Sequence, residues 1–204
     1  MIQGISEKII PEAYGDCLAI MAVAPKSILP ISIIEMHLFS YLACIMSLFD
    51  GQLVADWEYR FALTKEGFPF SPQLEGARRK IIKRGLLTTH SNATLSPENP
   101  RFSQEINLFD GLASFSRRKQ WIKTATECTL ALPLGSIRYA LEGLPSIREA
   151  IKLNQNQTLL QKNEIAQLHE DYRIVLKALE DDVTDPLAPA VVWLSAKLFE
   201  RNQE

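Results

Sequence analysis

The sequence predicts a mainly α protein with a small β-wing: a winged helix-turn-helix followed by an all-helical C-terminal part. Three observations favour this fold. A capped basic helix is expected over residues 72–84, two short strands follow its terminal Gly85, and most of the remaining chain has helical periodicity. We expect a winged-helix domain with an N-terminal extension over residues 1–100 and a helical domain over residues 101–204.

The first half of the expected winged helix is strongly apolar. The run from Asp16 to Ala24 fits either a strand or a short buried helix, and its periodicity does not decide between them. A helix is expected over residues 31–49, and it is apolar nearly all round, so other elements or a partner must cover it. Residues 56–64 are expected to form a short second helix before a turn at Gly67.

The third helix has clear start and stop signals. Ser71 is a good N-cap because its hydroxyl can accept from a free backbone N–H, and Pro72 needs no N–H at the first helical position. Gly85 suits the left-handed residue that ends a helix. Apolar residues recur at helical spacing on the inner face: Leu74, Ala77 and Ile81.

The wing and the C-terminal helices follow. Residues 86–90 and 93–96 are expected to be two short strands joined by a turn at Ser91 and Asn92. After a connector that begins near Phe102, periodicity and breaker residues predict helices over residues 115–130, 136–141, 146–153, 158–180 and 187–199.

The charge of the chain is unevenly distributed. The 204 residues carry a formal net charge of −2 and are 47% hydrophobic, which argues against a protein that coats nucleic acid by charge alone. Residues 60–90 nevertheless hold seven Lys and Arg against two acids, whereas residues 164–185 hold seven acids against two bases. A basic centre and an acidic C-terminal part therefore sum to near-neutrality.

Signals for catalysis or metal binding are weak. The three cysteines, Cys17, Cys44 and Cys128, are widely spaced among apolar residues, which is typical of small buried side chains in a reducing cytosol. The three histidines have no carboxylate or cysteine at metal-site or triad spacing, and no phosphate-binding glycine motif is present. We therefore expect no enzyme activity, no cofactor and no metal site.

A cytoplasmic location without a membrane span is also expected. The N-terminus lacks the pattern of a signal peptide. The most apolar segment, residues 28–49, is interrupted by Pro30, Glu35 and His37, which favours a buried core helix over a membrane span.

The basic helix is the most informative candidate site. In winged helices the third helix can lie in the major groove, where Arg and Lys reach guanine edges and phosphates. The candidate contacts are Arg78, Arg79, Lys80, Lys83 and Arg84, with a second candidate patch at Arg117, Arg118 and Lys119. Three interpretations stay open: contact with double-stranded DNA, contact with a protein partner, and a helix face that is simply solvated.

Large apolar side chains form a second candidate surface. The chain has more large apolar side chains than the core of a small winged helix requires, among them Trp57, Phe68, Phe70 and Trp193. They are expected either to bury against each other between the two halves of the chain or to form a permanent interface with a partner, since obligate interfaces resemble a core cut in half.

Several segments resemble a known family. Residues 35–42, 56–59, 68–71 and 83–87 resemble the middle subunit of bacterial ABC three-component systems. Within that group they resemble the accessory subunit of Lamassu-type anti-phage and anti-plasmid defence complexes. The likeness covers residues 32–95, rests on pattern and size, and does not extend to the C-terminal half.

The resemblance implies a non-enzymatic adaptor. Such a subunit binds the head region of an SMC-like ATPase and helps to hold a nuclease effector inactive until foreign DNA is sensed, so that ATP, magnesium and cleavage belong to other subunits. Direct contact with double-stranded DNA is compatible with this role. The alternative is a stand-alone winged-helix transcription regulator or antitoxin-like repressor, which would form a self-complementary dimer on a palindromic site.

Overall fold

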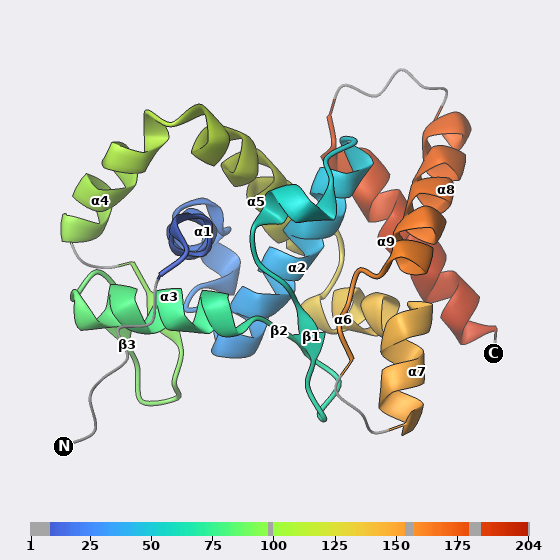
Figure 1. The fold of residues 1–204 in the computed structure, drawn as a ribbon, viewed down its shortest axis with the longest axis horizontal. Helices are drawn as coiled ribbons and strands as arrows, with labels where there is room; N and C mark the ends of the chain where they lie inside the picture. Colours follow the sequence, from blue (N-terminus) through green and yellow to red (C-terminus); the bar gives the residue numbers. More distant parts are fainter. Residues whose placement is uncertain (1–8, 98–99, 154–156, 180–184, 204) are drawn as a thin grey trace.

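The computed structural model describes residues 9–97, 100–153, 157–179 and 185–203, and it is mainly helical (Figure 1). The helices in these ranges are α1 (Pro11–Val23), α2 (Ile33–Phe49), α3 (Pro72–Lys83), α4 (Pro100–Asp110), α5 (Ala113–Ala131), α6 (Leu134–Glu142), α7 (Pro145–Leu153), α8 (Lys162–Ala178) and α9 (Leu187–Asn202). Two short 3-10 helices, η1 (Lys26–Ile28) and η2 (Val54–Trp57), and two antiparallel strand pairs complete the fold.

Helix α2 lies in the middle of the molecule and is buried from Met36 to Leu48 (Figure 1). It packs against α5 and α8, α5 also packs along α1, and α9 contacts α5, α6 and α8. Of the two expected covers for this apolar helix, other elements of the chain or a partner, the structure shows the first. Within the described ranges, no helix combines the length and the hydropathy that crossing a bilayer requires.

Helix α3 and the hairpin after it follow the sequence signals closely. The N-cap of α3 is Ser71, and Gly85 has a φ of 67°, the left-handed conformation predicted for it. Strand β3 (Thr88–Thr89) pairs with β4 (Leu95–Ser96). Ile31, just before α2, adds to the outer side of β4: its N–H donates to the carbonyl of Leu95 at 3.0 Å, and the Leu95 N–H donates back at 2.8 Å.

The expected helix over residues 56–64 is wrong. Helix η2 ends where Glu58 takes a left-handed φ of 68°, and the chain then extends into β1 (Ala62–Leu63), which pairs with β2 (Pro69–Phe70). The extended form is held from its other side as well. Leu63 N–H donates to the Gln157 carbonyl at 2.8 Å, so a segment far along the chain outweighs the local helical pattern.

Three further segments, in α1, α4 and α8, resolve or change what the sequence predicted. The undecided run from Asp16 to Ala24 lies mostly in α1, which supplies a helix before α2. The expected connector after Phe102 is helix α4, and the helix expected over residues 158–180 begins at Lys162, because residues 157–159 pair with the β1 segment. Its expected end at Glu180 lies outside the described residues.

The core continues across residue 100. Buried residues from α1, α2 and α3 and from α5, α6 and α9 belong to one hydrophobic cluster. The helical part therefore packs directly on the N-terminal part, and the division into two domains at residue 100 stays a prediction.

Candidate functional site

One face of α3 is open to solvent. Leu74, Ala77 and Ile81 are buried, and α3 packs on α1. Beside this buried stripe runs a second, more exposed stripe with Gln73, Lys80 and Lys83 exposed and Gly76 between the first two. Arg79 is exposed next to Lys83. We call Gln73, Arg79, Lys80 and Lys83 the outer face of α3.

Three of the five basic residues predicted as contacts pair with carboxylates, and Arg78 and Arg84 do so through two hydrogen bonds each. The guanidinium of Arg78 donates two hydrogen bonds of 2.7 Å to the Glu75 carboxylate, and both side chains are mostly buried. Arg84 donates to Glu105 on α4 at 2.5 and 3.1 Å and to the Tyr14 hydroxyl on α1 at 2.5 Å. Arg78 is therefore paired within α3, whereas Arg84 joins the end of α3 to α1 and α4, and neither guanidinium extends freely into solvent.

The cations of Arg79, Lys80 and Lys83 are accessible. Arg79 has 71% of its side chain exposed, and its ion pair with Glu75 at 2.7 Å is a surface pair that contributes at most about 1 kcal/mol. In the part of the chain that the structure describes, Lys80 and Lys83 are exposed and have no ion-pair partner. A phosphate or another anion could therefore contact Arg79, Lys80 and Lys83 without breaking the core.

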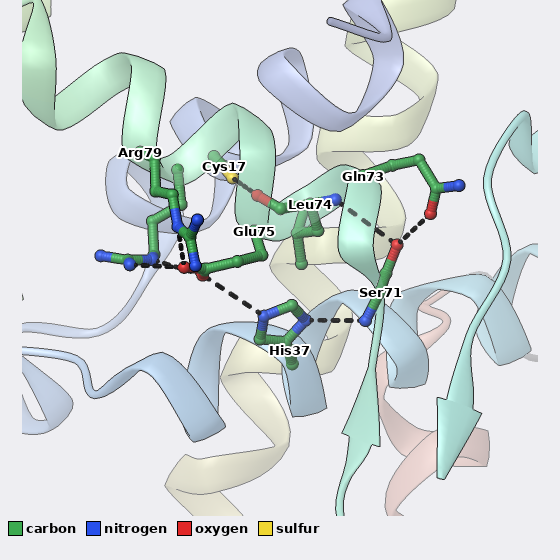
Figure 2. A network of polar contacts seen from close by, with 8 residues as sticks. Cys17, His37, Ser71, Gln73, Leu74, Glu75 and Arg79 are labelled. Carbon is green, nitrogen blue, oxygen red and sulfur yellow. Dashed lines mark hydrogen bonds and ion pairs between the residues drawn. The ribbon is translucent and has the colours of Figure 1, made fainter. Parts of the chain in front are cut away.

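A polar network behind the outer face fixes the start of α3 (Figure 2). The Ser71 N–H donates to Nδ1 of the buried His37 at 3.2 Å, which joins α3 to α2. The Ser71 hydroxyl accepts from the Leu74 N–H at 3.4 Å and donates to Oε1 of Gln73 at 3.0 Å. From α1, the Cys17 thiol lies 3.6 Å from the Leu74 carbonyl. His37 is thus a buried side chain of α2 with a backbone hydrogen-bond donor as its partner.

Glu75 is the charged centre of this network. Its Oε2 lies 4.0 Å from Nε2 of His37, too far for a hydrogen bond, while Arg78 and Arg79 both donate to its carboxylate. Burial raises the pKa of Glu75, but the hydrogen bonds from the two arginines outweigh burial, so its pKa lies well below the ordinary value. Sequence reasoning missed this role, although Glu75 stands three and four residues before its partners, a spacing typical of helix ion pairs.

The β3–β4 hairpin beside α3 is polar. Its tip at Ser91, Asn92 and Ala93 is exposed, and Ala93 has a left-handed φ of 60°. The Asn92 side-chain oxygen accepts from the Thr94 N–H at 3.3 Å. Near its base, Nε2 of His90 lies 2.8 Å from the Ser96 hydroxyl. The tip thus offers hydrogen-bonding groups and no formal charge.

The second basic patch is corrected by the structure. Arg117 is exposed, but Lys119 pairs with Asp110 at 2.6 Å, and Arg118 is buried. Arg118 pairs with the fully buried Asp16 and lies over the Trp57 ring at 3.8 Å. The expectation that all three residues are exposed is wrong for Arg118, because a carboxylate from α1 draws its guanidinium into the core.

The expected apolar surface is largely internal. Trp57 and Trp193 are each 1% exposed and are therefore core residues, which corrects their assignment to an interface. Phe68 and Phe70 are half-buried. The Phe70 ring lies 4.6 Å from the His37 ring, and Arg138 lies over the Phe68 ring at 4.0 Å. Of the two interpretations, burial between the halves of the chain fits the tryptophans.

The cysteines and the acids that the structure describes form no metal centre. Cys17, Cys44 and Cys128 are buried and free, and burial raises the pKa of Cys128 to about 12. Among the described residues, no group of three or more His, Cys, Asp or Glu side chains is placed to hold a metal ion.

Comparisons with known proteins add nothing to this geometry. No family model matches the chain, and no curated protein and no solved structure matches it. The resemblance to Lamassu-type accessory subunits therefore stays a prediction, and the function is inferred from the residues themselves.

Proposed function

We propose that the chain is a winged-helix protein that contacts double-stranded DNA through α3. The observation that carries this proposal is the outer face of α3, where Arg79, Lys80 and Lys83 are accessible on a helix whose start is fixed to α2. In winged helices this is the helix that enters the major groove while the wing contacts the neighbouring backbone.

The order of the elements supports the fold part of the proposal. A winged helix runs helix, short strand, two helices and a hairpin, and its first strand pairs with the last. Here α1, Ile31, α2, α3, β3 and β4 follow in that order, and Ile31 pairs with Leu95 of β4. The segment between α2 and α3, with η2 and the β1–β2 pair, is an insertion in this scheme.

The accessible charge predicts modest, salt-sensitive binding. Each phosphate that a Lys or Arg neutralises releases counterions, so the slope of log K against log salt is about −0.9 per contact. With three accessible cations on α3, we expect a slope near −3 from this helix, with weak polar contacts from the wing tip. Such a protein binds duplex DNA locally and does not coat it, in agreement with its net charge of −2.

The test is a salt titration of duplex binding by the full chain, followed by fluorescence anisotropy. Lys80→Ala with Lys83→Ala is expected to lower the slope by about 2. The matched control is Lys162→Ala with Lys177→Ala, since both lysines are exposed on α8 at the other end of the molecule (Figure 1). Absence of duplex binding at 50 mM salt, or an equal effect of the two double variants, would refute the proposal.

An adaptor role in an SMC-like ATPase and nuclease complex is a second proposal. Exposed leucines at the junction of α4 and α5 favour it: Leu108 and Leu112 are 74% and 52% exposed. Isolated exposed leucines are ordinary, but two large apolar side chains four residues apart can hold a partner.

Purification of the tagged chain from its host tests this role. Recovery of an ATPase and a nuclease with the wild type and with Leu130→Asp, but not with Leu108→Asp and Leu112→Asp, is the expected result. Recovery of a dimer with DNA alone favours a regulator.

A further inference from the structure

Gln73 stands where a DNA-docking helix reads bases. It is the second residue of α3, after Pro72, and it is exposed. In helix-turn-helix proteins the N-terminal residues of the recognition helix contact base edges, while later residues reach the backbone. Lys80 and Lys83 follow about 10 and 15 Å further along the helix axis, at the rise of 1.5 Å per residue.

The carboxamide of Gln73 is held in one orientation. Its Oε1 accepts from the Ser71 hydroxyl at 3.0 Å, and Ser71 is fully buried. Ser71 is itself fixed by two further bonds, from its N–H to His37 and from the Leu74 N–H to its hydroxyl. Figure 2 shows the amide nitrogen of Gln73 directed away from this network. A flexible side chain thereby loses part of its rotational freedom before any ligand binds, which lowers the entropic cost of binding.

The free groups of this carboxamide match one base edge. Oε1 keeps a second lone pair after accepting from Ser71, and both amide N–H groups remain available. In the major groove adenine offers a donor at N6 beside an acceptor at N7, which is the complement of a Gln carboxamide, whereas guanine offers acceptors at both O6 and N7. Guanine would place O6 against Oε1, and the contact would be repulsive.

The residue next along the outer side of α3 permits close approach. Gly76 lies one turn after Gln73, is half-buried and carries no side chain, so no side chain of α3 stands at the position between Gln73 and Lys80. A side chain at this position would hold the helix away from the floor of the groove. Glycine costs about 1 kcal/mol in a helix interior relative to alanine, and close approach is the usual compensation.

We propose that Gln73 is the base-reading residue of α3 and that it selects adenine over guanine at one position of a duplex. This inference rests on the proposed DNA contact and adds its sequence preference. Arg79, Lys80 and Lys83 supply affinity through phosphates and Gln73 supplies discrimination, so the two contributions separate in an experiment.

The experiment is selection of duplexes from a randomised library by the full chain, followed by titration of duplex pairs that differ at the enriched position. The wild type is expected to enrich adenine at one position and to bind it about 10-fold or more tightly than guanine, within the range of a bidentate contact. Gln73→Ala is expected to lose this preference and to keep its affinity for random duplex within about twofold. Gln120→Ala, at an exposed glutamine of α5, is the matched control and keeps the preference.

Three outcomes overturn the inference, and they differ in whether they also refute the proposed DNA contact. Duplex binding by the wild type without any base preference refutes the role of Gln73 and leaves the DNA contact intact. An adenine preference that survives in Gln73→Ala assigns the reading to another residue. If the wild type does not bind duplex DNA at all, the proposed function fails and this inference fails with it.

Discussion

Arg118 on α5 and Asp16 on α1, 102 residues apart in the chain, form an ion pair inside the core. Nε of Arg118 donates to Oδ1 at 2.8 Å and a terminal nitrogen donates to Oδ2 at 2.5 Å. The Tyr59 hydroxyl also donates to this carboxylate and accepts from Ser40 of α2 at 2.6 Å. Burial and the negative charge of Asp16 raise the pKa of Tyr59 well above its usual value, so the phenol stays a donor. The cluster joins α1, α2, α5 and the segment after η2.

Breaking this pair should destabilise the fold strongly. Asp16→Asn leaves the guanidinium of Arg118 buried without a counter-charge, and loss of one partner of a buried pair costs about 3–5 kcal/mol. Urea denaturation followed by circular dichroism measures the free energy of unfolding. Arg117→Leu, at the exposed neighbour on the same helix, is the control and should change it by less than about 0.5 kcal/mol. Similar losses for Asp16→Asn and Arg117→Leu would contradict this account of the core.

Glu75 should make stability depend on pH in the acid range. Its pKa is lowered on folding from the ordinary 4.5, because the arginine hydrogen bonds outweigh burial. A group whose pKa falls on folding stabilises the native state fully above its unfolded pKa, and that stabilisation is lost as the pH falls through the folded pKa.

The corresponding variant is Glu75→Gln. At pH 7 we expect it to lose about 1.5–3 kcal/mol, the contribution of hydrogen bonds to a charged group. Below about pH 4.5 the wild type loses the same contribution, so the two unfolding free energies should converge. Glu66→Gln, at an exposed acid in the β1–β2 turn, should follow the wild type at every pH. A difference between Glu75→Gln and wild type that stays constant from pH 7 to pH 3 would rule out this linkage.

Neighbouring cations at the end of α3 should behave differently in DNA binding. Lys83 is free of ion pairs in the described part of the chain, whereas Arg84 is held by Glu105. Lys83→Gln is therefore expected to reduce the salt slope of duplex binding by about 1, and Arg84→Gln to leave the slope unchanged. Anisotropy titrations at several salt concentrations measure both slopes. Equal reductions would mean that Arg84 leaves Glu105 for a phosphate in the complex.

Local signals predicted the parts of the structure that local interactions determine. Ser71, Pro72 and Gly85 set both ends of α3, since caps and left-handed glycines act over a few residues. The hairpin after Gly85 and the inward residues Leu74 and Ile81 follow from the same short-range rules.

Long-range partners determined what the sequence could not predict. Residues 62–63 are extended because β2 and residue 157 provide backbone partners, and residue 157 lies far outside any local sequence window. Arg118 looks like a surface residue beside Arg117, and only Asp16, more than a hundred residues away, places it in the core. The candidate site also has one part set by local sequence and one part set by long-range packing. The positions of its cations were predicted, but the compensation of Arg84 by Glu105 depends on the packing of α4.

The three free cysteines should be unreactive in the native protein. Cys17, Cys44 and Cys128 are buried, and burial raises the pKa of each thiol, to about 12 for Cys128, so the reactive thiolate is scarce at pH 8. With an aromatic disulfide reagent we expect all three thiols to react in denaturant and none to react over the same period in buffer.

Because Cys17 contacts the Leu74 carbonyl behind the outer face of α3, its reactivity also reports on the packing of that helix against α1. His37→Ala removes the acceptor of the Ser71 N–H, and faster modification of Cys17 than of Cys128 in that variant is expected, with both sites read by mass spectrometry. Equal rates at the two sites would mean that His37 does not hold α3 in place.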